Sequence, residues 1–505
     1  MPAGLRMPAG FGVPALGRTA ARLRTRTGAL LARHRTFAVV LALAAALRVV
    51  TMLGYPPARL YWYDSFTYLD NAVHLRPSST FHPIGYPLLL RALLPFHSVT
   101  VVVAVQHAMG LATGLIVYAL ARHKGLPVWG AVLATVPVLF DASFLRLEHA
   151  VLSDTLFILL VVAAVAVLAW RERPSPRCAL VAGLLLAGAA LTRTIALPLL
   201  LLVLLVLALR RVSWRAVVVL ALAGMVPLAG YAAWYGATHG KVALSGADGV
   251  ALWARTMTFA DCAVVQPPPE LAPLCPNGTV VDAASEYVWA PGASINLLPG
   301  GRFAHNERAR EFALRAIAAQ PLDYLRDVFA DTSIAFRWTP VAHPARTVPA
   351  FGFARGIWSL PDQPLVAEVR RTYASDIGAM RSAGPYADVL IVYQRLAYLR
   401  GPVLAAILLL GAAGAVLRPG RAALPWAVAM GLLVGPVAAL DFDHRYVLPV
   451  VPVACVAAAL AVRPARPGKG DKEKGGRGVG VGSLERQEAA GPQEDRPPPH
   501  HLTAS

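Results

Sequence analysis

Long apolar runs recur along this chain and limit its fold more than any other feature. A helix needs about 20 apolar residues to cross the roughly 30 Å hydrocarbon core of a bilayer. Ten runs close to that length lie near residues 37–54, 99–121, 126–142, 151–170, 178–192, 194–209, 215–235, 400–417, 422–440 and 446–462. Of the 505 residues, 56% are hydrophobic and only 15% are charged. The sequence therefore predicts an all-α polytopic membrane protein with about ten transmembrane helices.

Basic residues indicate on which side of the membrane each loop lies. The formal net charge is +19, but the arginines gather at the ends of apolar runs and not on a helix face with interleaved aromatic residues. A nucleic-acid partner is therefore not expected. Basic clusters precede the first run and then recur at every second loop, which places both termini in the cytoplasm. The clusters lie at residues 6–35, 122–124, 171–177, 210–215, 418–421 and 463–469.

This topology divides the chain into five parts. They are a basic cytoplasmic N-terminus (1–36), a transmembrane module (37–236) with a first outer loop at 55–98, an extracytoplasmic domain (237–398) between spans 7 and 8, C-terminal transmembrane helices (399–462) and a disordered cytoplasmic tail (463–505). The first apolar run has no small-residue cleavage site and is expected to be retained as a span. The tail is rich in Gly, Pro and charge and lacks apolar periodicity.

Residues 178–209 are the ambiguous part of the membrane module. At about 1.5 Å per residue they are too many for one span and few for two. We expect two short helices that meet at "LTRT". One long span would instead put Arg210, Arg211 and Arg215 on the outer side.

Acidic residues are rare before residue 235, and their positions are informative. Five of the six lie on the expected outer side or at its membrane boundary; the six are Asp64, Asp70, Asp141, Glu148, Asp154 and Glu172. Carboxylates in or beside a bilayer are costly to desolvate and tend to mark function. Asp64 and Asp154 lie at the ends of apolar runs and predict an outward-facing acidic site. Asp70 and Asp141 fit ordinary loop charges.

The expected outer domain carries two local predictions. Its amphipathic stretch predicts two helices broken at Pro321. Cys262 and Cys275 both lie in it, and two cysteines that close a short loop on the oxidising side of the membrane predict a disulfide. The glycosylation sequon at Asn277 is taken as a chance match, because the residue usage is typical of a high-GC bacterial genome.

Four stretches of the chain resemble a known family. They are "YDSFTYLDNA…FHPIGYPLLLRAL", "LEHAVLSDTLFILL", "GAALTRTIALPLLLL" and "DFDHRYVLPVVP". In this order they are similar to the GT-C superfamily of membrane glycosyltransferases, in its bacterial branch akin to the protein O-mannosyltransferases and the lipid A aminoarabinose transferases. The resemblance covers residues 37–235 and 400–460. It implies a GT-C-like fold and a polyprenyl-phosphate-linked sugar donor.

The resemblance gives two acids a catalytic role. Asp64 matches the acid of the family's first outer loop, and Asp154 in "LSDTLF" matches the acid that opens the fourth span. Ser65 stands where many relatives have Glu, so the sequence does not define a two-carboxylate metal site at this position. The sequence identifies no metal ligands, and it leaves open whether a divalent cation is a cofactor. A nucleotide-sugar site is not expected.

Transfer from a lipid-phosphate sugar with inversion needs a base and a cation. A carboxylate near the lipid headgroups can take the proton of the acceptor hydroxyl, and we expect Asp64 to do so. We expect Arg193 and Arg445 to hold the leaving phosphate, although interfacial arginines also snorkel without function. Further candidates for donor or substrate binding are Tyr68, His82, Glu148, Asp443 and His444. The aromatic residues around Tyr68 also fit an interfacial belt.

These observations predict an integral-membrane glycosyltransferase of the bacterial plasma membrane, with its active site facing outward. The acceptor would be an extracytoplasmic glycan, lipid or protein. A lipid-linked sugar flippase, another transporter or a non-catalytic envelope assembly protein would carry similar charges. The sequence shows neither the inverted repeats nor the broken mid-membrane helices that are typical of transporters.

Overall fold

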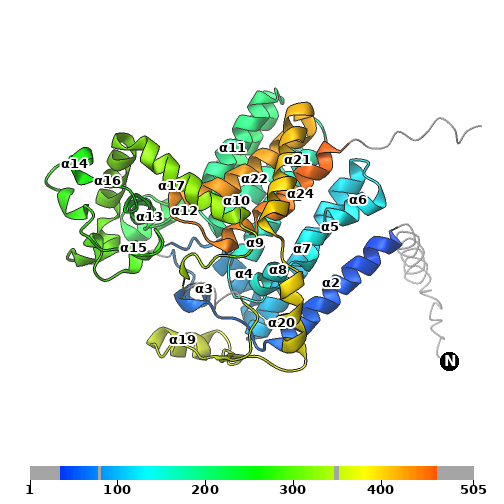
Figure 1. Ribbon diagram of the computed structural model, residues 1–505, viewed down its shortest axis with the longest axis horizontal. Helices are drawn as coiled ribbons and strands as arrows, with labels where there is room; N and C mark the ends of the chain where they lie inside the picture. The colour runs from blue at the N-terminus through cyan, green and yellow to red at the C-terminus, as the bar shows by residue number, and fades with distance from the viewer. Residues whose placement is uncertain (1–33, 78–80, 346–351, 463–505) are drawn as a thin grey trace, which may run out of the picture. The chain divides into compact units, whose positions relative to one another are not determined.

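The computed structural model describes residues 34–77, 81–345 and 352–462, and these are mostly helical, with almost no strands (Figure 1). Within them, the only sheet pairs β1 (Ile357–Trp358) with β2 (Met380–Arg381) in antiparallel register. The expected basic N-terminus and the expected tail lie almost wholly outside the described residues, so those two predictions stay open.

Five apolar stretches are long enough to cross a membrane. They are α2 (Arg35–Gly54), α5 (Val99–His123), α12 (Trp214–His239), α22 (Pro419–Ala439) and the stretch His444–Ala461, which comprises α23 (His444–Val447) and α24 (Val450–Ala461). The pair α20 (Tyr386–Leu396) and α21 (Gly401–Leu417), bent by 57°, gives a sixth if it is one span. Three shorter apolar helices accompany them: α9 (Asp154–Trp170), α10 (Pro176–Thr192) and α11 (Ala196–Leu209). The chain is therefore a multi-pass membrane protein, but the expected count of ten spans is not established.

The sequence predicts one transmembrane helix near residues 126–142, but the helix in this stretch is broken. This stretch forms two short helices, α6 (Val128–Leu133) and α7 (Val136–Phe140). Pro137 has no N–H to continue the helical hydrogen bonds. At the break, Thr135 Oγ1 donates to Val132 O at 2.7 Å. A third short helix, α8 (Ala142–Glu148), follows directly.

Residues 178–209 form two helices, as expected. Arg193 separates α10 from α11 with an extended backbone (φ −147°, ψ 125°). Helix α10 packs between α9 and α12, while α21, α22 and α24 pack on one another. A Cβ at Gly183 would lie 2.6 Å from Leu220 O, so this glycine permits the close approach of α10 to α12.

Residues 237–398, expected as one outer domain, pack in two parts. The first part contains α13 (Asp248–Thr256), α14 (Cys262–Val265), α15 (Glu286–Trp289), α16 (Asn306–Ala319) and α17 (Pro321–Ser333). Trp253 and Phe312 are fully buried in its own core. The predicted break at Pro321 is confirmed, and the Sγ atoms of Cys262 and Cys275 are bonded. Single 3-10 turns lie at Leu94–Phe96, Ala272–Leu274, Ser294–Leu297, Arg302–His305 and Ile334–Phe336.

The second part packs against α2 and against the first outer loop, whose helices are α3 (Trp62–His74) and α4 (Gly85–Leu93). It contains β1, β2, α20 and α19 (Pro364–Thr372), and α19 packs against α3. Tyr373 OH donates to Leu90 O at 2.9 Å, across 283 positions of sequence. The outer loop that carries Asp64 is thus held in place by a segment that lies far away in the sequence.

Candidate active site

The first outer loop presents Asp64 on α3 and fixes the start of that helix. Ser65, the next residue, is fully buried. Its Oγ accepts a hydrogen bond from Tyr61 N at 2.7 Å and donates one to Val151 O at 2.8 Å. The start of α3 is therefore tied to the segment that leads into α9, where Asp154 lies.

Asp64 is a partly exposed carboxylate with cationic partners. Its side chain is 29% exposed; His82 Nε2 lies 3.2 Å from Oδ1, and Arg445 Nη1 lies 3.7 Å from Oδ2. Burial by itself would raise the pKa of Asp64, but His82, Arg445 and Arg193 outweigh it and lower the pKa to about 2. The carboxylate is therefore ionised at neutral pH.

Arg445 lies between two carboxylates and two aromatic rings. Its Nε is 3.1 Å from Asp443 Oδ2, and its backbone N donates to Asp443 Oδ1 at 2.9 Å. The guanidinium carbon lies 5.3 Å from the ring centre of Tyr61 and 5.0 Å from that of Tyr446. Burial raises the pKa of Asp443 even with Arg445 beside it. The environments of Asp64 and Asp443 thus shift their pKa values in opposite directions.

Arg193 and Asp154 form a second pair of opposite charge in the same cluster. Arg193 Nη1 donates to Asp154 Oδ1. Asp154, the first residue of α9, is 1% exposed, whereas the Arg193 side chain is 20% exposed. The Arg193 guanidinium carbon lies 5.0 Å from the ring centre of Tyr446, the ring that Arg445 also contacts. Within the described residues, Asp154 Oδ2 is buried without a hydrogen-bond partner.

Tyr68 supports His82 from within the protein. The two ring centres are 4.5 Å apart, and Tyr68 OH lies 3.0 Å from Ser153 Oγ. Tyr68 is only 4% exposed. Its ring therefore has little free surface on which a sugar could stack.

Two candidate residues lie outside this cluster. Glu148 is 1% exposed; it accepts a hydrogen bond from Arg48 Nη2 at 2.7 Å and lies 2.9 Å from His107 Nδ1. His444 Nε2 accepts a hydrogen bond from Val341 N at 3.0 Å. Both side chains hold elements of the fold together and contact none of the residues around Asp64 that are described above.

The two acids that fit loop charges have local partners. Asp70 lies 2.9 Å from both His74 Nδ1 and Arg76 Nη2. Asp141 caps α8 by accepting from Ser143 N at 2.6 Å. Neither contacts Asp64.

Sequence reasoning missed Tyr446, whose ring contacts both Arg193 and Arg445. Its position directly after Arg445 in "DFDHRY" was the available signal. Tyr61, expected as part of an interfacial aromatic belt, also contacts Arg445. Both rings add cation–π contacts that limit how the guanidinium groups can move.

The carboxylates around Asp64 are not arranged as a metal site. Asp64 has Arg445 beside it, and Asp154 is paired with Arg193. In the described part of the chain, one group of three His, Cys, Asp or Glu side chains brings a ligand atom from each within 4.8 Å of the others, and it lies elsewhere. Arg445 is therefore the positive charge that stands beside Asp64.

Comparison with known proteins gives distant structural neighbours. No protein-family model matches this chain, and no curated protein matches it. The protein O-mannosyltransferase Pmt1-Pmt2 complex of S. cerevisiae, bound to the sugar donor, is similar at 16% identity and a TM-score of 0.33, over 41% of this chain and 34% of that chain. The archaeal oligosaccharyltransferase AglB from Archaeoglobus fulgidus, in complex with an inhibitory peptide and a dolichol-phosphate, is similar at 14% identity and a TM-score of 0.39, over 84% of this chain and 50% of that chain.

ArnT from Cupriavidus metallidurans in the apo state is similar at 14% identity and a TM-score of 0.35, over 85% of this chain and 77% of that chain. All three neighbours are GT-C glycosyltransferases, the superfamily that the sequence motifs resemble. This chain spans about a third of the matched yeast chain and half of the archaeal one.

Proposed function

We propose that this chain is a membrane glycosyltransferase that moves a sugar from a polyprenyl-phosphate donor to an extracytoplasmic acceptor, with Asp64 as the general base. One observation carries the proposal. Asp64 is 29% exposed, whereas Asp154 and Asp443 are 1% and 8% exposed. Among these carboxylates, Asp64 is the one that an acceptor hydroxyl can approach, and it stands 3.7 Å from the guanidinium of Arg445.

The reaction can be written with all bonds and charges accounted for. Asp64 takes the proton of the acceptor hydroxyl, and the hydroxyl oxygen forms a bond to the anomeric carbon of the sugar. The bond from that carbon to the phosphate oxygen breaks on the opposite face, so the configuration inverts. The polyprenyl phosphate leaves with the electron pair. Negative charge therefore moves from Asp64 toward the phosphate as transfer proceeds.

Arg193 and Arg445 are placed to stabilise that developing charge. The guanidinium carbon of each arginine lies 5.0 Å from the ring centre of Tyr446. Because both contact the same ring, the two guanidinium groups lie close to each other. Their side chains are 20% and 15% exposed. Two planar guanidinium groups can bind one phosphate through several charged hydrogen bonds. They would act before and during bond cleavage.

Donor binding would also make Asp64 a better base. With a pKa of about 2, its carboxylate holds a proton poorly while Arg445 and Arg193 favour its ionised form. A phosphate bound to these two arginines adds negative charge nearby and offsets their effect on Asp64. The pKa of Asp64 should rise when the donor is bound, which would couple proton uptake to donor occupancy.

Asp154 and Asp443 are proposed to position the arginines. Each is nearly buried, and each pairs with one of them. The proposed site therefore consists of a base that an acceptor hydroxyl can reach, two cations that bind phosphate, and two buried carboxylates that hold these cations.

An amide substitution at Asp64 tests this assignment. Mass spectrometry of cell-envelope glycans in a deletion strain would first identify the missing sugar and its acceptor. Asp64→Asn keeps the shape of the side chain and removes its basicity, so the transfer rate should fall by about 10²- to 10⁴-fold. Binding of a polyprenyl phosphate should be largely retained. Asp70→Asn, which removes the same charge from the same helix beside Arg76, is the matched control and should transfer at the unmodified rate.

Arg445→Ala separates the two proposed roles. It should weaken binding of the polyprenyl phosphate and also lower turnover, because the cation acts on the ground state and the transition state. A folded Asp64→Asn protein that transfers sugar at the unmodified rate would refute the proposal. If that protein also moves lipid-linked sugar across vesicle membranes, the transporter alternative would take its place.

A further inference from the structure

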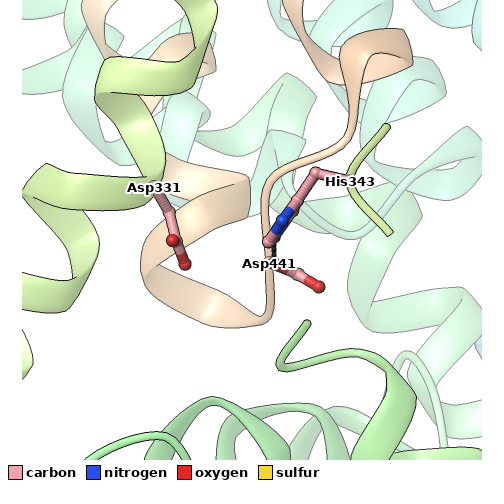
Figure 2. Close-up of side chains that lie close together, drawn as sticks. All are labelled: Asp331, His343 and Asp441. Atoms are coloured by element: carbon pink, nitrogen blue, oxygen red, sulfur yellow. Dashed lines mark hydrogen bonds and ion pairs between the residues drawn. The ribbon is translucent and has the colours of Figure 1, made fainter. Parts of the chain in front are cut away.

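A second cluster of ligand-type side chains lies apart from the Asp64 cluster. It consists of Asp331 near the end of α17, His343 in the loop that follows, and Asp441 in the turn after α22 (Figure 2). One ligand atom from each lies within 4.8 Å of the other two. Among residues 34–77, 81–345 and 352–462, no other group of three or more His, Cys, Asp or Glu side chains meets this condition.

Asp441 is held rigidly by groups outside the cluster. Its Oδ2 accepts hydrogen bonds from Ser285 N at 2.9 Å and from Ser285 Oγ at 2.8 Å, and its Oδ1 accepts one from Phe442 N at 2.7 Å. The Asp441 side chain is 2% exposed. Supporting hydrogen bonds of this kind orient the carboxylates that bind metal ions in proteins.

Asp331 is supported in a similar way. Arg255, itself 1% exposed, donates to Asp331 Oδ2 and also lies 3.4 Å from Asp327 Oδ2. Arg255 binds Oδ2 of Asp331, and one oxygen of the same carboxylate belongs to the cluster. The Asp331 side chain is 22% exposed, which gives a small ion a route into the cluster.

The charges around His343 favour a cation. Its Nε2 lies 2.9 Å from Asp441 Oδ1. Asp441 and Asp331 each bring a carboxylate oxygen within 4.8 Å of a ring nitrogen of His343. Two carboxylates beside one neutral imidazole form a donor set that can bind a metal ion.

We propose that Asp331, His343 and Asp441 bind one divalent transition-metal ion through one carboxylate oxygen of each aspartate and Nε2 of His343. One imidazole with two carboxylates suits zinc or manganese better than calcium or magnesium, which prefer oxygen ligands alone. Three protein ligands leave room for water in the remaining positions.

The expected consequence of this ion is positional. Asp441 lies two residues before Asp443 and four before Arg445. An ion that joins Asp441 to α17 and to the loop at His343 would fix the segment from which Arg445 extends. The ion would then stabilise the attachment of the outer helices to the last span without touching any reacting atom.

The test uses the purified full-length chain without a polyhistidine tag. After removal of metal with EDTA, we expect zinc or manganese to rebind at one ion per chain, measured by mass spectrometry of metal content after gel filtration. The melting temperature should rise with the ion, and magnesium should not replace it. Asp331→Asn and His343→Gln should each weaken binding of the ion by at least about tenfold.

Asp327→Asn is the matched control. Asp327 is on the same helix and near the same Arg255, but it contributes no ligand atom to the cluster. It should bind the ion like the unmodified chain. Equal loss in Asp327→Asn would indicate general charge attraction and overturn the proposal, as would metal content far below one ion per chain in the unmodified protein. Asp64→Asn should keep the ion, so failure here is separable from failure of the proposed transfer reaction.

Discussion

At the scale of single residues, Glu148 is a buried carboxylate whose contacts are structural and lie outside the proposed reaction. Its carboxylate is enclosed by Arg48 from α2 and His107 from α5. Gly110 makes room for it, because a Cβ at that position would lie 1.8 Å from Glu148 Oε1. These contacts describe a structural ion pair inside the helical module. They explain why an acid in the membrane module need not belong to the active site.

Replacing Glu148 by Gln should therefore destabilise the fold. The change keeps the size of the side chain but leaves the Arg48 guanidinium, which is 2% exposed, without an anionic partner. The cost of breaking a buried pair in this way is about 3 to 5 kcal/mol. The free energy of unfolding in detergent micelles would be compared with that of Glu172→Gln, whose partner Arg421 lies 3.4 Å away on the exposed surface. Equal stability of the two variants would contradict the structural role of Glu148.

The sequence singles out the residues of the candidate site more readily than it does their contact partners. Asp64 and Asp154 stand out as acids at the ends of apolar runs, where carboxylates are costly to desolvate. Arg193 and Arg445 stand out as arginines on the expected outer side, where arginines are few. Arg48 gave no such signal, since it lies inside an apolar run and its partner is 100 positions away. Ser65 also gives no signal of its role, because its hydrogen bonds to Tyr61 and Val151 depend on how the chain folds.

At the scale of elements, Asp376 joins two segments that lie far apart in the sequence, because its carboxylate caps the start of α5. Its carboxylate accepts hydrogen bonds from Val99 N at 2.9 Å and Thr100 N at 3.2 Å, and from the hydroxyl of Ser98 at 2.7 Å. The first N–H groups of α5 have no partners within the helix. A carboxylate at this end also interacts favourably with the helix dipole.

Replacing Asp376 by Ala should lower stability in a pH-dependent manner. Burial raises the pKa of Asp376, but the hydrogen bonds from residues 98–100 outweigh it and lower the pKa below the ordinary 3.8. Because the folded pKa is the lower one, the contribution of Asp376 is fully present above pH 3.8 and is lost as the pH falls through the folded value. Near neutral pH the substitution should cost about 1 to 3 kcal/mol.

The measurement is the unfolding free energy at neutral pH and in the acid range. The difference between Asp376→Ala and the unmodified chain should shrink at low pH. Asp388→Asn, at an exposed ion pair with Arg355, should change stability little at either pH. A pH-independent difference for Asp376→Ala would show that the carboxylate charge is not what stabilises α5.

Helices were predictable where apolar length decided them, and less so where a local break or a distant contact did. The two helices on either side of Arg193 and the break at Pro321 agree with the sequence. Pro137 divides the stretch at 126–142, although the run of apolar residues continues through it. The packing of α19 on α3 has no local sequence signal, because it depends on contacts between segments nearly 300 residues apart.

At the scale of the whole molecule, the proposed transfer requires the cluster around Asp64 to lie on the same side of the membrane as the acceptor. The cluster around Asp64 draws on α3, α9, the break between α10 and α11, and the start of α23. If residues 237–398 are outside, α3 and α19, which pack together, must lie on the same side. The proposed donor phosphate would then be bound at the outer surface of the bilayer.

Cysteine labelling tests this arrangement in intact cells. We expect a membrane-impermeant maleimide to reach Val280→Cys, at a side chain that is 87% exposed, and not Lys124→Cys, which lies in a predicted cytoplasmic loop. Cys178 and Cys455 would be replaced by Ala, while Cys262 and Cys275 should label only after reduction because they are bonded. Permeabilised cells supply the control, since both introduced cysteines should label there. Labelling of Lys124→Cys but not Val280→Cys in intact cells would invert the topology, place Asp64 on the cytoplasmic side and contradict an extracytoplasmic acceptor.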